Sequence, residues 1–177
     1  MKNPILNVND VEFRARPERY APQGQAAEKF EVSTADISRQ LGAEKLGYNI
    51  SSVPPGKAAY PFHSHRVNEE MFFVLSGSGE LRILDETFPL REGDVIACPA
   101  GGPETAHQIR NVGDTDLRYL AVSTMASPEI CDYPDSKKFG VYAKLQDSED
   151  GTPRYFYFMG RHGTALDYWD GEGSESE

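Results

Sequence analysis

The sequence contains little cysteine and no long hydrophobic run. Two cysteines, Cys98 and Cys131, occur in 177 residues, which is too few for the disulfide framework of a small secreted protein. The N-terminus has no apolar run of signal-peptide length, and no later stretch is long enough to span a bilayer. We therefore expect a cytoplasmic protein without a membrane partner. We also expect Cys98, which lies in an apolar run, to be a buried thiol.

Basic residues are outnumbered by acidic ones. The chain has 18 lysines and arginines against 28 aspartates and glutamates, which gives a formal net charge of −10. A negatively charged chain repels phosphate backbones. The composition therefore argues against nucleic acid as a partner. The hydrophobic fraction of 38% is that of an ordinary folded globular protein.

Sustained helical periodicity is also scarce. The best helix candidate is residues 33–41, with Ser33 or Thr34 as the cap and Gly42 as the stop. An irregular connection that carries one turn of helix is the alternative interpretation of this segment.

Strand signals dominate instead. Short aliphatic and aromatic runs recur between turn residues, at 45–53, 70–75, 80–84, 86–90, 95–98, 107–111 and 117–123. This spacing predicts an all-β sandwich or barrel rather than a sheet with helical crossovers. The glycines of residues 76–79 predict a tight hairpin between two strands. The run 71–75 is apolar on both faces, which suits a closed or double-layered structure.

The C-terminal region is aromatic and then acidic. Residues 154–160 form a final strand packed on the outside of the fold in our preferred interpretation, and a subunit contact or a lid in the alternative one. We expect residues 171–177 to be disordered.

Two of the four histidines stand two positions apart. In a strand, His63 and His65 point to the same face, about 6.5–7 Å apart, so both rings are able to reach one ion. Neutral imidazole suits first-row transition metals. A carboxylate follows at Glu69 or Glu70, and strand periodicity alone leaves both open. Outside this pattern, His162 is expected to be a surface residue.

Two longer segments carry a resemblance to a known family. Residues 56–77 hold a glycine, the His-x-His pair, and a glutamate six residues before Gly77, and they resemble the first motif of the cupin superfamily. The match makes Glu70 the motif glutamate. A second motif is matched in order by Gly93, Pro99, Gly101, His107 and Asn111. Five residues separate Gly101 from His107, where the family pattern has two, so we expect a longer loop at the barrel mouth.

The resemblance implies an all-β double-stranded β-helix (jelly-roll or cupin barrel), with an N-terminal strand segment and a C-terminal aromatic arm. Residues 1–43 would be the N-terminal strands and connection, 44–125 the barrel core, and 126–177 the C-terminal extension. It also implies one divalent transition metal ion (Zn, Fe, Mn or Ni) held by His63, His65, Glu70 and His107.

Two functions are compatible with such a site. The first is a metal-dependent enzyme, of the isomerase or dioxygenase type, acting on a small polar molecule. The second is a small-ligand binding or sensing module without turnover. Supporting groups near the site are expected among Arg82, Tyr60, Glu104 and Gln108. From the resemblance and the aromatic C-terminal segment, we also expect a homodimer.

Overall fold

The computed structural model describes residues 4–173, which are dominated by short strands. The strands are β1 (Arg14–Ala15), β2 (Ser33–Asp36), β3 (Leu46–Val53), β4 (Ser64–His65), β5 (Glu70–Ser76), β6 (Ser78–Ile83), β7 (Glu86–Arg91), β8 (Val95–Cys98), β9 (His107–Arg110), β10 (Leu117–Thr124), β11 (Glu129–Tyr133), β12 (Lys138–Lys144) and β13 (Tyr155–Arg161). The helical turns are η1 (Glu18–Tyr20), α1 (Gln25–Lys29), α2 (Ser38–Leu41), η2 (Pro103–Thr105) and η3 (Pro134–Ser136). No helix within 4–173 is long and apolar enough to cross a membrane.

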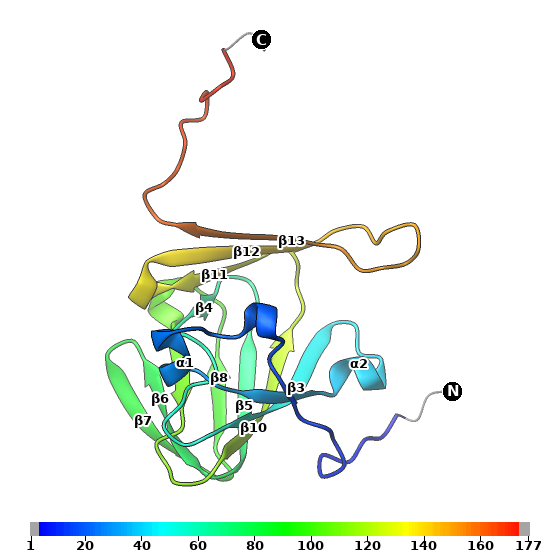
Figure 1. Ribbon diagram of the computed structural model, residues 1–177, viewed down its shortest axis with the longest axis vertical. Helices are drawn as coiled ribbons and strands as arrows, with labels where there is room; N and C mark the ends of the chain where they lie inside the picture. The colour runs from blue at the N-terminus through cyan, green and yellow to red at the C-terminus, as the bar shows by residue number, and fades with distance from the viewer. Residues whose placement is uncertain (1–3, 174–177) are drawn as a thin grey trace.

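The strands form a barrel of antiparallel sheets (Figure 1). A six-stranded sheet has the order β1-β2-β3-β10-β5-β8, and a three-stranded sheet has the order β7-β6-β9. The core lies between these two sheets. Phe72 and Val74 of β5 and Tyr119 of β10 meet Leu81 of β6 and Ile109 of β9 there. The expected closed, double-layered β structure is therefore confirmed.

A four-stranded sheet, β13-β12-β11-β4, lies at one end of the barrel. In Figure 1 it crosses the top of the molecule, and the chain after β13 runs away from the barrel. The strand β13 pairs with β12 from Tyr155 opposite Lys144 to Arg161 opposite Lys138. The aromatic segment is thus a final strand, as expected. The prediction of disorder for residues 171–177 falls partly on 174–177, which lie outside the described residues.

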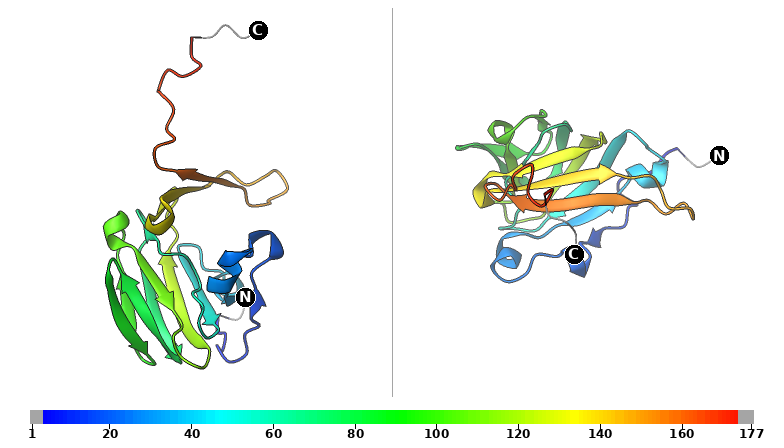
Figure 2. Two further views of the ribbon diagram at one scale, coloured as in Figure 1. Left: turned by 60° about the vertical axis from the view of Figure 1, so that its left-hand side comes forward. Right: turned by 90° about the horizontal axis from the view of Figure 1, so that it is seen from above.

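Residues before β2 pack along one side of the barrel (Figure 2). The Lys57 ammonium donates to the carbonyl oxygens of Ala27 and Glu28 at 2.9 and 3.0 Å, and the Glu31 backbone N–H donates to the carbonyl oxygen of Ala58 at 3.1 Å. The N-terminal segment is therefore fastened to the stretch of chain that leads into the histidine pair.

The helix expected over residues 33–41 is mostly wrong. Residues Ser33–Asp36 form β2, which pairs with β3, and the buried side chain of Ala35 faces the core. Sheet pairing over these four residues outweighs their weak helix propensity. Only Ser38–Leu41 are helical, and Gly42 ends this turn in the left-handed conformation, as predicted.

The hairpin predicted at residues 76–79 is also wrong. The strands β5 and β6 follow each other directly but belong to different sheets. Gly77 has φ 85°, and a Cβ placed there would lie 2.6 Å from the carbonyl oxygen of Asp116. Gly77 therefore lets the chain leave one sheet for the other at a point where backbone segments are in close contact.

Candidate metal centre

The histidine pair enters the barrel beside the start of β9. The backbones of His63 and His107 are paired, with N–H to carbonyl oxygen distances of 3.1 and 2.8 Å. The pairing brings the two rings to a centroid distance of 4.8 Å, and the rings of His63 and His65 lie 5.0 Å apart. Because side chains alternate along a strand, Ser64, between His63 and His65 in the sequence, points to the opposite face. Three imidazoles therefore gather at one end of the core.

Glu70 supplies the carboxylate in the middle of these rings. It begins β5 on the same face as the buried Phe72 and Val74, whereas Glu69 is exposed. The Glu70 Oε2 atom lies 3.2 Å from Nε2 of His107 and 3.3 Å from Nε2 of His65. The parity that the sequence left open is thus decided in favour of Glu70.

The donor atoms are close enough for one small cation. One ligand atom each from His63, Glu70 and His107 lie within 4.8 Å of one another. The buried Nε2 of His65 faces the Glu70 carboxylate, yet it has no hydrogen bond of good geometry within residues 4–173. Buried polar atoms without partners are uncommon, so this donor set fits a metal ion. His65 contacts Glu70 but also belongs to a second group.

A hydrogen bond with the backbone fixes the orientation of the His63 ring. Its Nδ1 lies 2.8 Å from the carbonyl oxygen of Pro61. A carbonyl oxygen only accepts, so Nδ1 carries the proton and Nε2 keeps its lone pair. Tyr133 stacks on the same ring at a centroid distance of 6.1 Å and an interplanar angle of 18°. His63 is thus held as a neutral donor with its free nitrogen available.

The charges in the cluster are strongly coupled. Burial lowers the pKa of His63 to about 4, with a further lowering from the charges of His107 and His65. Burial also opposes a charged His65, but the hydrogen bond with Cys131 and the nearby Glu70 carboxylate outweigh it and raise the pKa of His65 to about 10. Although burial raises the pKa of Glu70, the hydrogen bond with His107 and the close imidazole of His65 bring it far below its ordinary value. The histidines therefore keep Glu70 in its charged carboxylate form.

The second group is His65 with Glu129 and Cys131, both on the inner face of β11. The Nδ1 atom of His65 lies 3.3 Å from Sγ of Cys131 and 3.7 Å from Oε2 of Glu129. The Glu129 carboxylate already accepts backbone N–H groups of Val67 at 3.2 Å and Asn68 at 2.8 Å, and the Asn68 side-chain amide also donates to it. We therefore interpret this group as support for His65 rather than as another ion site.

The sequence reasoning missed the inner face of β11. Glu129, Cys131 and Tyr133 alternate along it and all face the histidine pair. Their signal is the period of two in a short strand, but that period does not say which face is inside. Pairing of Cys131 with His65 across β11 and β4 decides the face.

The four supporting groups expected from the sequence lie in different places. The Tyr60 ring is 6.2 Å from the His63 ring. Arg82 pairs with Asp135 at 2.8 Å, and the Glu104 carboxylate accepts the backbone N–H of Gly102 at 2.8 Å, in an exposed position. Of these four groups, Tyr60 is thus the one whose ring lies beside a histidine ring. Gln108 donates to the Tyr60 carbonyl oxygen at 2.8 Å.

Two further residues and one loop match their expected surroundings. Cys98 is buried, and burial raises its pKa to about 12. The loop of residues 102–106 contains the turn η2, and the backbone of Gly101 donates to the carbonyl oxygen of His65 at 2.8 Å. His162 is exposed, with Nε2 3.4 Å from the buried carboxylate of Asp132.

Comparison with known proteins identifies this barrel. Residues 49–123 match the family model of the cupin domain. A solved sugar phosphate isomerase of the cupin superfamily, from Silicibacter pomeroyi, superposes with a TM-score of 0.71 at 24% identity, over 93% of this chain and 98% of that one. The chain contains a cupin domain. A polyketide cyclase from Streptomyces resistomycificus shares the cupin fold at a TM-score of 0.54 and 22% identity, over 71% of this chain and 82% of that one.

Curated relatives of the cupin domain are more similar in sequence but cover less. An uncharacterized protein of Methanocaldococcus jannaschii is 35% identical over 71 residues, which are 40% of this chain and 54% of the relative. An oxalate-binding protein of Thermotoga maritima is 34% identical over 70 residues, with the same coverage of 40% and 54%. The chain thus spans about half the length of the curated relatives it matches.

Proposed function

We propose that His63, His65, Glu70 and His107 bind one divalent transition metal ion, and that the protein is a metal-dependent enzyme acting on a small polar molecule. The observation that supports this is the convergence of three imidazoles on one largely buried carboxylate. Three nitrogen donors and one oxygen donor suit Zn, Fe, Mn or Ni. The reaction is of the isomerase or dioxygenase type.

The residues of the site have separable roles in this proposal. A bound ion would supply Lewis acidity and, if it is iron, redox chemistry. Glu70 offsets part of the ion's charge, and the hydrogen bond from His63 to Pro61 keeps the ring nitrogen aimed at the ion. An ion that accepts more than four ligands would keep room for a substrate oxygen when these four residues hold it. The buried Phe72 ring, 5.8 Å from the ring of His107, gives the site an apolar wall on its core side.

A binding or sensing module is the second candidate function. One observation favours it: a curated relative at 34% identity is an oxalate-binding protein. In this case the ion orients a small ligand without turnover. Product formation that depends on the metal supports the enzyme, whereas tight ligand binding without product under the same conditions supports the binding module.

Elemental analysis tests the metal proposal directly. The purified protein should hold close to one transition metal ion per chain, and His63→Ala should lose most of it. His162→Ala is the matched control, because His162 is an exposed histidine outside the cluster. Full metal occupancy in His63→Ala would refute the site.

We further propose that the protein is a homodimer that contacts its partner through β13. The support is an edge strand with four exposed aromatic side chains, two on each face: Tyr155, Phe156, Tyr157 and Phe158. Exposed aromatic clusters are typical of subunit contacts. The cytoplasmic location and the lack of nucleic acid and membrane partners stay predictions.

A further inference from the structure

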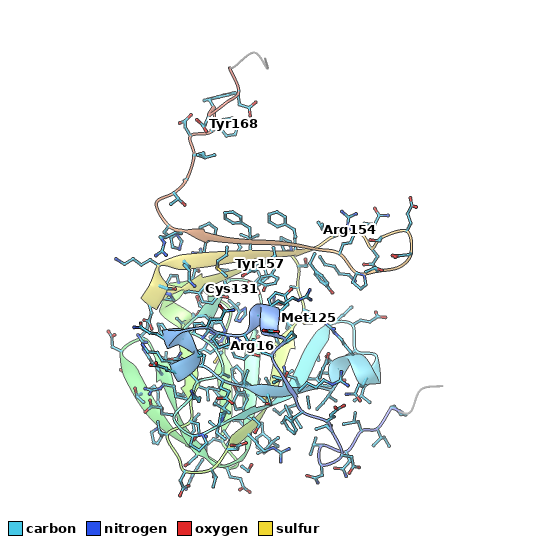
Figure 3. The ribbon with its side chains drawn as sticks, in the orientation of Figure 1. Arg16, Met125, Cys131, Arg154, Tyr157 and Tyr168 are labelled. Carbon is cyan, nitrogen blue, oxygen red and sulfur yellow. The ribbon has the colours of Figure 1, made fainter. Side chains whose placement is uncertain are left out.

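Arg16 is a cation that the metal site does not use. It follows β1 in the N-terminal segment and is half-buried, and its Nη2 donates to the carbonyl oxygen of Ala59 at 3.1 Å. Figure 3 labels Arg16 where this segment lies along the barrel. None of the ion pairs within residues 4–173 includes it. In a chain of net charge −10, a half-buried guanidinium without a carboxylate partner is a candidate for ligand binding.

Tyr60 connects this guanidinium to the metal centre. The Cζ atom of Arg16 lies 5.1 Å from the centre of the Tyr60 ring, and that ring lies 6.2 Å from the ring of His63. Tyr60 is 41% exposed, so it borders solvent as well as the site. Burial raises the pKa of its hydroxyl, the charge of Glu70 raises it further, and Arg16 opposes the rise. The charges of both Arg16 and Glu70 therefore act on the Tyr60 hydroxyl.

The backbone at this point is held from two sides. Arg16 donates to the carbonyl oxygen of Ala59, and Gln108 donates to that of Tyr60 at 2.8 Å. Ala59 itself is buried in the core. These contacts hold the guanidinium and the backbone of Tyr60 in place before any ligand arrives, which lowers the entropy cost of binding one.

We propose that Arg16 and Tyr60 form an anion-binding subsite beside the metal centre. The ligand is a small molecule with a metal-binding oxygen group at one end and a carboxylate or phosphate at the other. A guanidinium offers only donors, and a phenol donates readily, so an anionic oxygen group is the complement to this pair. The inference rests on the proposed function, because the first end of the ligand is assigned to the metal ion.

Three probe molecules distinguish binding at the metal ion from binding at Arg16 and Tyr60. The zinc-loaded protein is titrated calorimetrically with acetate, which has one carboxylate, with succinate, which has two, and with phosphoglycolate, which has a carboxylate and a phosphate. We expect succinate or phosphoglycolate to bind at least about tenfold more tightly than acetate, the usual effect of a charge-assisted hydrogen bond. The tighter of these two probes identifies the anion as carboxylate or phosphate.

Arg16→Gln should abolish this tenfold difference while the affinity for acetate and the zinc content stay unchanged. Arg14→Gln is the matched control, because Arg14 is a nearby exposed arginine paired with Glu12 at 3.0 Å. Tyr60→Phe, which keeps the ring and removes the hydroxyl, should reduce the difference and provides the test if Arg16→Gln does not fold.

The outcomes against the subsite differ from those against the metal site. A wild-type protein that takes up no zinc overturns the proposed function, and the subsite with it. Zinc uptake with equal affinity for all three probes overturns the subsite alone. An affinity difference between the probes that persists in Arg16→Gln also overturns the subsite. So does an Arg16→Gln variant that loses zinc and acetate binding together, because Arg16 would then only hold the N-terminal segment in place.

Discussion

The Sγ atom of Cys131 lies 3.3 Å from Nδ1 of His65, on the side of the ring away from Glu70. The two residues pair across β11 and β4, so their separation is fixed by the sheet. Because Nε2 of His65 faces Glu70, the atom that Cys131 contacts is the one that carries the proton when Nε2 binds a metal. Figure 3 labels Cys131 on this sheet.

Cys131→Ala should weaken metal binding without unfolding the protein. Loss of an outer partner of a ligating histidine typically costs 10- to 100-fold in metal affinity, and we expect about tenfold here. The measurement is the dissociation constant for zinc by competition with a chromophoric chelator. Cys98→Ala is the control for loss of a buried thiol, since Cys98 is equally buried and lies opposite Glu70 in the sheet, but it forms no hydrogen bond with a histidine ring within residues 4–173. Equal zinc affinities in the two variants would contradict the role of Cys131.

Glu70 and its neighbour Glu69 allow a test of the carboxylate ligand. Glu70→Gln should remove most of the bound metal, because a neutral amide neither balances the ion's charge nor coordinates as strongly. Glu69→Gln should leave metal content unchanged, since Glu69 is exposed on the other face of β5. Both variants remove one negative charge, so a general electrostatic effect would reduce the metal content of both equally.

Much of the barrel was predictable because local sequence patterns mark its strands. All seven predicted strands occur, with ends shifted by two residues or fewer. Pairing partners were harder. The glycines after β5 predict a turn, but only the approach of Gly77 to Asp116 shows that the chain changes sheets there. That contact joins residues far apart in the sequence, and local propensity carries no information about it.

The candidate site was predictable to the same degree. The spacing of His63 and His65 marks a shared face, and the resemblance to cupins supplied Glu70 and His107. Cys131, which contacts His65, and Arg16, which belongs to the proposed subsite, were not found. Each comes from a segment whose position against the histidines is set only by the folded sheet or by the packed N-terminal segment. Residues that support a site from distant segments leave no local pattern.

Metal removal should lower the thermal stability of the wild-type protein. A ligand that binds only the folded state stabilises it by about 2.7 kcal/mol at a concentration of 100 times Kd. For a chain of this length, that corresponds to a rise in Tm of roughly 5–10 °C. Scanning calorimetry with and without zinc measures the difference, and His107→Gln should show little of it. A similar rise in His107→Gln would indicate that zinc binds elsewhere.

The dimer proposal predicts that Phe156→Glu makes the protein monomeric. Phe156 lies on the edge strand β13 and is 48% exposed, so a charge there costs the monomer little but would be buried in a subunit contact. Light scattering at micromolar concentration measures the mass. The control is Val95→Glu, because Val95 is an exposed apolar residue on β8, an edge strand of the six-stranded sheet. A monomeric wild type, or a dimer broken only by Val95→Glu, would exclude β13 as the contact.

Gly77 and Gly93 separate backbone strain from steric contact. Both have a left-handed backbone, with φ 85° and 89°, so an alanine at either costs about 1–2 kcal/mol. A Cβ at Gly93 meets nothing within 4 Å, whereas at Gly77 it would lie 2.6 Å from a backbone oxygen. We therefore expect Gly77→Ala to lower the free energy of unfolding by roughly 2–5 kcal/mol in urea titrations, clearly more than Gly93→Ala. If the two variants lose equal stability, then the turn at Gly77 tolerates a side chain. In that case the close approach of Asp116 is not the reason for a glycine at this position.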